Sequence, residues 1–457
     1  MNVYGVEVAI KNVPVLDKEF VPIGKFNEAF LKTATKPVGI AVERNDGQTA
    51  VYTTYIHGTA DKKQADTYYI DRLCKTVLWM KGGYKIYVSG DKAVYEYLKQ
   101  TYARDGARAF DVEVMELVYE KGFVVEYCEQ LPKQNESAQP VGRHLDGCRI
   151  GFDAGGSDRK VSAVIDGKSV YSEEVVWSPK TTTDPSYHYN EILSALRTAA
   201  AHMPRVDAIG VSSAGIQISN HTMHASLFMS VPREQWDEHV KDMYIRAARQ
   251  VGVEKVAVAN DGDVTALAGA MSLNANNILG IAMGTAEAAG YVDSSGNIAG
   301  WINELAFVPV DVSPDAMMDE WAGDIGCGVK YFSQDGVIKL AQNGGLVFCD
   351  CHTPAEKLKM VQKMLLDGSK LAENVYTSIG VYLGHTLAFY HELYGFEHVL
   401  LLGRVMSGRG GDIIIETANE VLDDEYASVA KQIALSLPDE KFRRVGQSVA
   451  AASLPKI

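Results

Sequence analysis

Apolar and polar positions between residues 148 and 177 alternate in a way that predicts three strands. Residues 148–156 form an apolar run that ends in small residues, and residues 160–166 and 169–177 are two further runs of strand length. Gly167 and Lys168 separate the last two runs, which is typical of a hairpin-like connection. The pattern therefore predicts a strand that turns into an antiparallel pair.

A helix and another strand are predicted directly afterwards. Residues 189–203 carry apolar side chains at helical spacing, at Ile192, Leu196, Ala199 and Met203. Residues 206–215 are again an apolar run that ends in small residues. The order strand, hairpin, helix and strand predicts an α/β fold.

The amino-terminal part of the chain repeats this order more faintly. Strand-like residues 38–58 are followed by a helical stretch at 68–80, a strand at 84–90 and a helix at 93–103. One interpretation is a degenerate half-copy of the later unit, in which Ala41 takes the place of Asp153. Such a copy would have no acid for a metal and would serve as a scaffold or an interface.

A polar segment divides the chain. Residues 131–147 contain two prolines and no aromatic residue, and they are predicted to be a linker. We therefore expect an additional α/β domain at 1–130 and a longer functional region at 148–457.

Composition and charge narrow the class of protein. Hydrophobic residues make up 47% of the 457 residues and charged residues 22%, as in globular proteins with a sizeable core. The formal net charge of −14 opposes binding to nucleic acid or to an anionic membrane. The start of the chain lacks the features of a signal peptide, and no apolar run is long enough to span a membrane, so we expect a cytoplasmic protein. The six cysteines are expected to be free thiols or small buried side chains.

The first candidate site residues end the strand at 148–156. Asp153 is followed by Gly155, Gly156 and Ser157, and such a turn can point backbone N–H groups at a phosphate while the carboxylate holds Mg²⁺ through water. The same residues also suit a plain hairpin corner, so the pattern alone leaves both interpretations open.

A second acid follows another strand end. In the segment 256–270, Asn260 and Asp261 come directly before a helical pattern, where Asp261 is placed to accept a proton from a hydroxyl that Asn260 orients. Alternatively, Asp261 or Asp263 caps the helix.

Two more strand ends carry glycines. Gly284 and Thr285 form a second turn with a glycine and a hydroxyl, and Gly403 ends a leucine-rich strand before a glycine-rich loop that could support a flat base. A second hairpin is expected after Thr285.

Four motifs in this order resemble those of the ROK family of sugar kinases and regulators, in the actin-like ATPase superfamily. By this resemblance, DAGGS from Asp153 is the first phosphate motif and NDGDVTALAGA from Asn260 carries the catalytic acid. GTAEAAG from Gly284 is the second phosphate motif, and LLLGRVMSGRGG from Leu400 is the adenosine motif. The resemblance covers residues 148–457. It implies a two-lobed, ribonuclease H-like fold that binds ATP and Mg²⁺ and phosphorylates a sugar or polyol with Asp261 as the general base. It also implies a homo-oligomer, a dimer. The implied nucleotide contacts are Asp153, Gly155, Gly156, Ser157, Gly284, Thr285, Gly403 and Arg404.

The implied acceptor site departs from the family pattern. The family motif GEIGH corresponds to residues 303–307, where Glu304 is kept and Phe307 replaces a histidine, and Val329 stands where the family has a glutamate. Ser213 and Gly215 are further candidates to line the sugar site, although a tight turn without contact explains them equally well. Loss of two polar groups is expected to change the preferred acceptor.

The implied zinc site is also altered. The family's cysteine cluster corresponds to residues 320–327, where Glu320 and Ala322 replace cysteines, so no structural zinc is expected. The acids Asp319, Glu320 and Asp324 are expected to form a solvated face rather than a cation site.

A second functional class remains open. The ROK family includes transcriptional repressors, so a non-catalytic sensor that binds a sugar or nucleotide is the alternative to a kinase.

Overall fold

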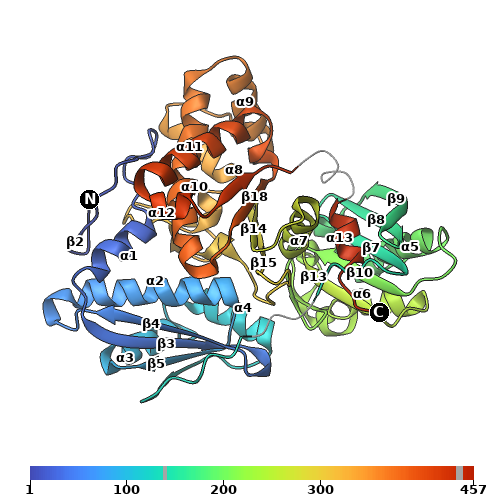
Figure 1. The fold of residues 1–457 in the computed structure, drawn as a ribbon, viewed down its shortest axis with the longest axis horizontal. Coiled ribbons are helices and arrows are strands. Elements are labelled where there is room, and N and C mark those ends of the chain that lie inside the picture. Colours follow the sequence, from blue (N-terminus) through green and yellow to red (C-terminus); the bar gives the residue numbers. More distant parts are fainter. Residues whose placement is uncertain (137–140, 439–445) are drawn as a thin grey trace. The chain divides into compact units, whose positions relative to one another are not determined.

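A computed structural model describes residues 1–136, 141–438 and 446–457 (Figure 1), and these divide into two compact units. The first contains the described residues of 1–137 together with 281–289 and 303–437, and the second contains those of 138–280, 290–302 and 438–457. The amino-terminal region thus belongs to one unit with later segments of the chain. Of the predicted linker, residues 137–140 lie outside the described residues.

The second unit is built on a five-stranded mixed sheet in the order β13-β10-β7-β8-β9. Its strands are β7 (Cys148–Ala154), β8 (Asp158–Ile165), β9 (Lys168–Val176), β10 (Ala208–Ser213) and β13 (Val256–Asn260). Strands β7, β10 and β13 are parallel, whereas β8 and β9 continue the sheet as antiparallel strands. The predicted hairpin is confirmed, since Ile165 pairs with Lys168.

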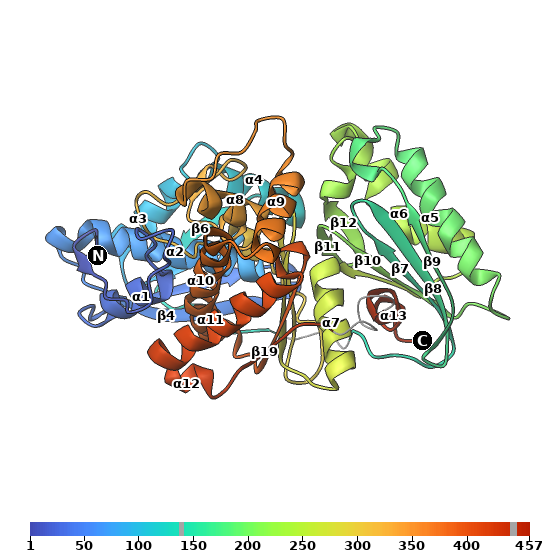
Figure 2. The same cartoon turned by 90° about the horizontal axis from the view of Figure 1, so that it is seen from above.

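Helices cover both faces of this sheet (Figure 2). They are α5 (Pro185–Ala200), α6 (Met243–Gln250), α7 (Asp261–Leu273) and α13 (Gln447–Ala452). Ile150 and Phe152 point into a core with α5 and α6. Gly151, which points to the other face, lies so close to the backbone of α13 at Ser448 that no Cβ would fit. Smaller elements complete the unit: β11 (Ile216–Ile218), β12 (His221–His224) and several short helical turns.

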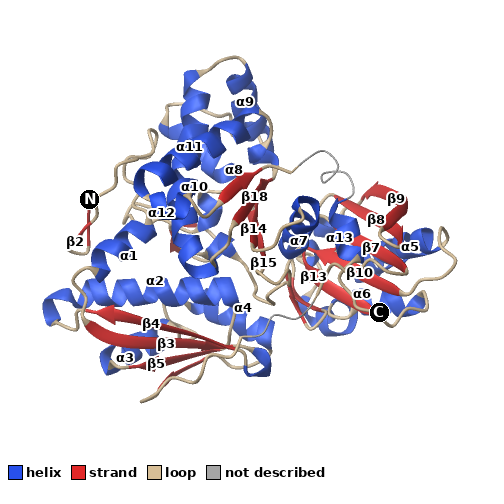
Figure 3. Cartoon of the chain, viewed as in Figure 1, coloured by secondary structure: helices blue, strands red, loops and turns tan. Residues whose placement is uncertain are grey.

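The amino-terminal region forms a four-stranded sheet with helices (Figure 3). Its main elements are α1 (Ile23–Leu31), β3 (Lys36–Glu43), β4 (Thr49–Ile56), α2 (Lys63–Lys81), β5 (Lys85–Ser89), α3 (Lys92–Thr101), α4 (Ala109–Tyr119) and β6 (Val124–Tyr127). The short strands β1 (Asn2–Val3) and β2 (Val6–Glu7) precede them. The strand order is β4-β3-β5-β6, and α2 runs along this sheet.

The half-copy interpretation of this region stays a prediction, but the topology of its sheet differs from that of the second unit. In the second unit, the strand after the helix, β10, pairs with β7 in parallel. In the amino-terminal sheet, the corresponding β5 pairs with β3 in the antiparallel direction. The direction differs because three antiparallel strands precede the helix in the second unit, whereas only β3 and β4 precede it here. The local order of elements is alike, but the topology differs.

The rest of the first unit combines a second sheet with a group of helices. The sheet has the order β15-β14-β18-β19, with β14 (Ile278–Met283), β15 (Glu287–Val292), β18 (His398–Leu402) and β19 (Ala434–Ser436). The helices are α8 (Gln334–Asn343), α9 (Pro354–Leu366), α10 (Lys370–Tyr394), α11 (Arg409–Glu425) and α12 (Ala427–Ala430). A short antiparallel pair of strands, β16 (Met318–Asp319) and β17 (Asp324–Ile325), lies between β15 and α8 in the sequence.

Helices α10 and α11 pack closely because glycines face the contact. A Cβ added to Gly380 would stand 2.5 Å from Thr417, and one added to Gly384 would stand 2.7 Å from Val421. None of the helices in the described part of the chain is long and apolar enough to cross a membrane.

Candidate functional site

The carboxyl ends of the three parallel strands bring predicted polar residues to one edge of the second unit's sheet. Asp153 in β7 stands opposite Ser212 in β10, and Ser213 stands opposite Asn260 in β13. The hydroxyl of Ser212 donates a hydrogen bond of 2.7 Å to Oδ1 of Asp153. In open α/β sheets this edge is where ligands bind. The structure therefore brings Asp153, Ser213 and Asn260 together where chemistry is expected.

The Asp153 carboxyl is perturbed by its surroundings. It is only 7% exposed. Burial raises the pKa of Asp153 to about 6; the hydrogen bond from Ser212 opposes this shift, and the nearby charge of Asp261 adds to it. At neutral pH such a group is ionised, although no ion pair holds it among the described residues. A buried anion of this kind suits a cation ligand.

Asp261 is the first residue of α7, and the residue before it caps the helix. Oδ1 of Asn260 accepts a bond of 2.7 Å from the N–H of Gly262, so Asn260, not Asp261 or Asp263, is the N-cap. The amide of Asn260 also donates to the carbonyl of Gly215 over 2.8 Å. Burial raises the pKa of Asp261, against the hydrogen bond that its carboxylate accepts from Gly262. The capping role does not consume the Asp261 carboxylate, which is left for chemistry.

The turn after β7 is tied to the end of β9. The indole of Trp177 donates to the carbonyl of Gly155 over 2.8 Å, and its backbone N–H donates to the carbonyl of Ser157 over 3.1 Å. A Cβ on Gly155 would stand 2.6 Å from the carbonyl of Asp158. Gly155 is needed for close approach of the backbone rather than for a left-handed conformation. The predicted phosphate turn is thus a braced backbone loop beside Asp153.

Ser213 and Gly215 have structural partners. The hydroxyl of Ser213 lies 2.8 Å from the hydroxyl of Tyr244. Gly215 has a φ of +103°, and its Cα lies against the backbone of His224, where a Cβ would not fit. The tight-turn explanation accounts for Gly215, while its carbonyl holds Asn260 in place.

In the first unit, the other two predicted turns are neighbours. Gly403 follows β18 with a φ of +99° and lies directly against the backbone of Met283, just before Gly284 and Thr285. The carbonyl of Gly284 accepts a bond of 2.9 Å from the N–H of Gln334, at the start of α8. The second phosphate motif and the adenosine motif therefore meet in one place. Arg404 begins the next short helical turn there.

Glu287, in the second phosphate motif, points into the interior of the first unit. It is 4% exposed, and neither carboxylate oxygen has a hydrogen-bond partner. Burial, and then the charge of Glu304, raise the pKa of Glu287 to about 8. Its carboxyl lies against Gly328, where no Cβ would fit. Glu287 is therefore mostly protonated at neutral pH and carries little negative charge.

The loop that carries Glu304 is held by the amino-terminal region. The N–H of Glu304 donates to the carbonyl of Trp79 over 3.0 Å, and that of Asn303 donates to Met80 over 2.9 Å. Phe307 stands where the family has a histidine. The centroid of its ring lies 4.3 Å from the ring centroid of Trp79 and 5.4 Å from that of Phe110. Helices α2 and α4 thus form the support of this predicted acceptor loop.

A buried ionic network lies beside the same helices. Asp324 in β17 contacts the side chains of Arg72, Lys75 and Arg108 at 2.9, 3.1 and 2.6 Å. Burial alone would raise the pKa of Asp324, but these three charges hold it well below its ordinary value. Two further acids of the network balance the remaining charge: Asp71 and Asp111. The expectation of a solvated acidic face is wrong for Asp324, because helices α2 and α4 supply cations that the local sequence could not reveal.

The cysteines of the protein are in two states, disulfide-bonded and free. Cys349 and Cys351 form a disulfide, so the expectation that all six cysteines are thiols or small buried side chains is wrong for this pair. Cys74, Cys128, Cys148 and Cys327 are free. Within the described ranges, no group of three or more His, Cys, Asp or Glu side chains could hold a metal ion.

Sequence reasoning missed several residues of the strand-end site. Ser212, rather than its neighbour Ser213, contacts Asp153, and only the strand register distinguishes them. The amide of Gln447 donates to the Ser212 hydroxyl over 3.2 Å and to the carbonyl of Asp261 over 3.4 Å. Gln447 comes from α13, far along the chain, and carries no motif that could have indicated this contact.

Comparison with solved structures identifies the fold. A ROK glucokinase from Streptomyces griseus, in complex with glucose and AMPPNP, matches with a TM-score of 0.50 and 19% identity over 67% of this chain and 98% of that one. A putative sugar kinase from Cytophaga hutchinsonii matches at 0.51 and 13% over 67% and 98%. A ROK transcriptional regulator, a homologue of the E. coli MLC protein, matches at 0.51 and 20% over 68% and 78%.

These likenesses show the fold of the chain, a mixed α/β fold shared with the matched kinases and the regulator. Within the α/β class, its fold is that of the ROK proteins, which confirms at the level of the fold the resemblance seen in the motifs. About a third of this chain has no counterpart in these structures. No family model and no curated protein sequence matches it.

Proposed function

We propose that the protein is a kinase that transfers a phosphoryl group from ATP to a hydroxyl of a sugar or polyol. The observation that carries this proposal is the partly buried Asp261 carboxylate at the start of α7, close enough to Asp153 for its charge to raise the pKa of that residue, on a fold shared with sugar kinases. Phosphoryl transfer needs positioning and charge neutralisation more than a strong nucleophile. The strand-end site of the second unit supports the positioning, and Asp153 could hold a cation that neutralises phosphate charge.

Asp261 is the proposed general base. Burial raises the pKa of Asp261 towards the pH at which a base works best, while Asn260 takes over the capping of the helix. The carbonyl of Asp261 is bonded by Gln447, which fixes the backbone at the base. The acceptor hydroxyl gives its proton to the Asp261 carboxylate as its oxygen attacks the terminal phosphorus.

Asp153 fits a magnesium ligand. Its Oδ1 is used by Ser212, and the carboxylate is otherwise without an ion-pair partner in the described part of the chain. Mg²⁺ binds carboxylates and waters, and it would neutralise charge on the phosphates. The backbone of Gly155, Gly156 and Ser157 is the proposed cradle for the phosphates.

The first unit contributes the other proposed contacts. Gly284 and Thr285 are proposed to contact phosphates, and Gly403 and Arg404 the adenosine, since the two turns meet in one place. Glu304 is the proposed acceptor ligand. Its loop is fixed by backbone hydrogen bonds to Trp79 and Met80.

The test is release of ADP from Mg²⁺–ATP against a panel of hexoses, amino sugars, pentoses and polyols. Turnover with one acceptor class, abolished by Asp261→Asn, supports the proposal. Absence of turnover with every acceptor contradicts it.

A sensor without catalysis is the second candidate. It is favoured by the similar likeness to a ROK regulator and by Phe307, an apolar ring in place of a polar acceptor ligand. A sensor would bind a sugar or nucleotide with a measurable affinity and yet release no ADP, which calorimetry beside the turnover assay would reveal.

A further inference from the structure

Lys180, which belongs to none of the four motifs, lies beside the turn that follows β7. Lys180 sits in a short helical turn, η3 (Pro179–Thr181), and its side chain is exposed. Its Nζ would stand 3.2 Å from a Cβ on Gly156, and its Cε 3.0 Å. The ammonium group therefore lies over the bare backbone of Gly156, in the turn that we propose to cradle phosphates.

The backbone around Lys180 is held although its side chain is free to move. The carbonyl of Lys180 accepts a bond of 2.5 Å from the hydroxyl of Ser230, and the carbonyl of Pro179 lies 2.9 Å from Nε2 of the buried His188. Three residues earlier, Trp177 bonds the turn itself at Gly155 and Ser157. The same segment thus braces the turn and presents the lysine to it.

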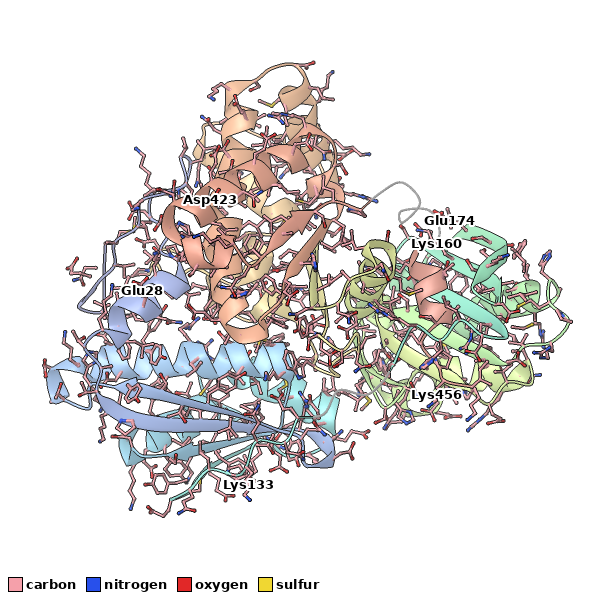
Figure 4. All side chains as sticks on the ribbon, viewed as in Figure 1. Glu28, Lys133, Lys160, Glu174, Asp423 and Lys456 are labelled. Carbon is pink, nitrogen blue, oxygen red and sulfur yellow. A yellow bond between two sulfur atoms is a disulfide. The ribbon has the colours of Figure 1, made fainter. Side chains whose placement is uncertain are left out.

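The charge of Lys180 is not used within the protein. No carboxylate lies within ion-pair distance of it in the part of the chain that the structure describes. By contrast, Lys160 on β8 lies 3.6 Å from Asp158 and stands opposite Glu174 in the β8–β9 register (Figure 4). Lys180 also acts on Asp261, whose pKa its charge lowers against the larger effect of burial. It is therefore a cation between a backbone anion cradle and the proposed base.

We propose that Lys180 binds the terminal phosphoryl group of the nucleotide and stays with that group as it is transferred. This inference rests on the proposed function. An ammonium group is a compact charge with three donors, suited to a phosphoryl oxygen. Near Asp153 and Asp261, a triphosphate needs such a cation, because two carboxylates alone would repel it.

The step balances without a further reactant. The bond between the terminal phosphorus and the bridging oxygen breaks, and its electron pair leaves with ADP. The bond from the acceptor oxygen to phosphorus forms, and the hydroxyl proton passes to Asp261. Lys180 keeps its proton and neutralises charge on the moving group, as other cations do in phosphoryl transfer.

The experiment compares three variants of the full chain by equilibrium titration with Mg²⁺–ATP and with AMP. Lys180→Met removes the charge, Lys180→Arg keeps it, and Lys168→Met removes an exposed lysine at the β8–β9 hairpin as the matched control. We expect Lys180→Met to weaken ATP binding about tenfold or more and to leave AMP binding unchanged. Lys180→Arg is expected to recover most of the loss, and Lys168→Met to bind like the wild type. Unfolding midpoints should be alike for all, since the Lys180 side chain makes no internal contact that holds the fold.

The outcomes separate this proposal from the proposed function. If the wild type prefers ATP to AMP and Lys180→Met loses that preference, the lysine binds the terminal phosphates, whether or not any acceptor turns over. If sugar phosphorylation is measured and Lys180→Met matches the wild type in both kcat and ATP affinity, the function stands and the role of Lys180 is overturned. A wild type that binds ATP and AMP equally also overturns it.

Discussion

Two regions of this molecule each bury a carboxylate, but they shift its pKa in opposite directions. In the first unit, Asp324 is surrounded by Arg72, Lys75 and Arg108, and its pKa is held low. In the second unit, Asp153 makes no ion pair within the described ranges, and its pKa rises to about 6. Both groups are more than nine-tenths buried, so burial does not explain the difference.

The difference lies in what compensates the charge. A buried charge with protein partners has its desolvation cost at least partly offset, and removal of one partner leaves the others uncompensated and destabilises the fold. A buried carboxylate without ion-pair partners lowers the stability of the fold, and a bound ligand can offset this loss. Such groups are typical of functional sites. We therefore expect the ionic network around Asp324 to stabilise the fold, whereas the strand-end site around Asp153 and Asp261 is where we propose that a cation and a substrate bind.

Removal of the base should give the largest change. Asp261→Asn is expected to lower kcat by about 10²- to 10⁴-fold, since a general base contributes about that much. ATP affinity should change little, because the amide keeps the shape of the side chain. Asp237→Asn, an exposed acid of the same unit, is the control and should leave kcat unchanged. Turnover of Asp261→Asn at the wild-type rate would remove Asp261 from this role.

Removal of the paired acid should instead damage the fold. Asp324→Asn leaves three buried cations short of one negative charge, and breaking such a network costs about 3–5 kcal/mol of unfolding free energy. Urea unfolding at neutral pH would measure it. A variant as stable as the wild type would show that the network is not what holds β17 to α2 and α4.

The unpaired acid should respond in the opposite direction. Between its ordinary pKa of 3.8 and about 6, the folded Asp153 keeps a proton that the unfolded chain has lost, so its contribution to stability falls as pH rises through this window. Asp153→Asn removes this contribution and keeps an acceptor for Ser212. We expect the variant to be more stable than the wild type by about 1–3 kcal/mol at pH 8 and nearly equal at pH 4.

Activity should follow the reverse pattern for the same residue. In the proposed function, the ionised form of Asp153 binds Mg²⁺, so wild-type turnover should fall as pH drops through about 6. Asp153→Asn should be stable and inactive at every pH. A stable variant that still uses Mg²⁺–ATP would contradict the ligand role.

The comparison also explains what the sequence could predict. Strand ends are local, so Asp153, Asp261 and Gly403 were identifiable from apolar runs that stop at polar or glycine residues. The partners of those residues are not local. Ser212 is chosen by strand register and Gln447 by a helix near the end of the chain. The sequence thus predicts the atoms that do chemistry better than the atoms that orient them.

The amino-terminal region shows the same limit more strongly. Its order of strands and helices was predicted, but the antiparallel pairing of β3 with β5 depends on long-range packing that periodicity does not encode. The cations that meet Asp324 come from α2 and α4, more than two hundred residues earlier in the chain. Nothing near residue 324 indicates them.

The smallest expected effect tests whether the amino-terminal region also influences the proposed acceptor site. Phe307→Leu keeps an apolar side chain but loses the aromatic contacts with Trp79 and Phe110, which are worth about 0.5–1.5 kcal/mol. If the loop position sets acceptor binding through Glu304, acceptor affinity should fall about 2- to 10-fold while nucleotide affinity stays constant. Phe123→Leu, whose ring stacks on Tyr102 instead, is the matched control and should lower stability alone. Equal acceptor affinity in both variants would show that the amino-terminal region contributes to stability and not to acceptor binding.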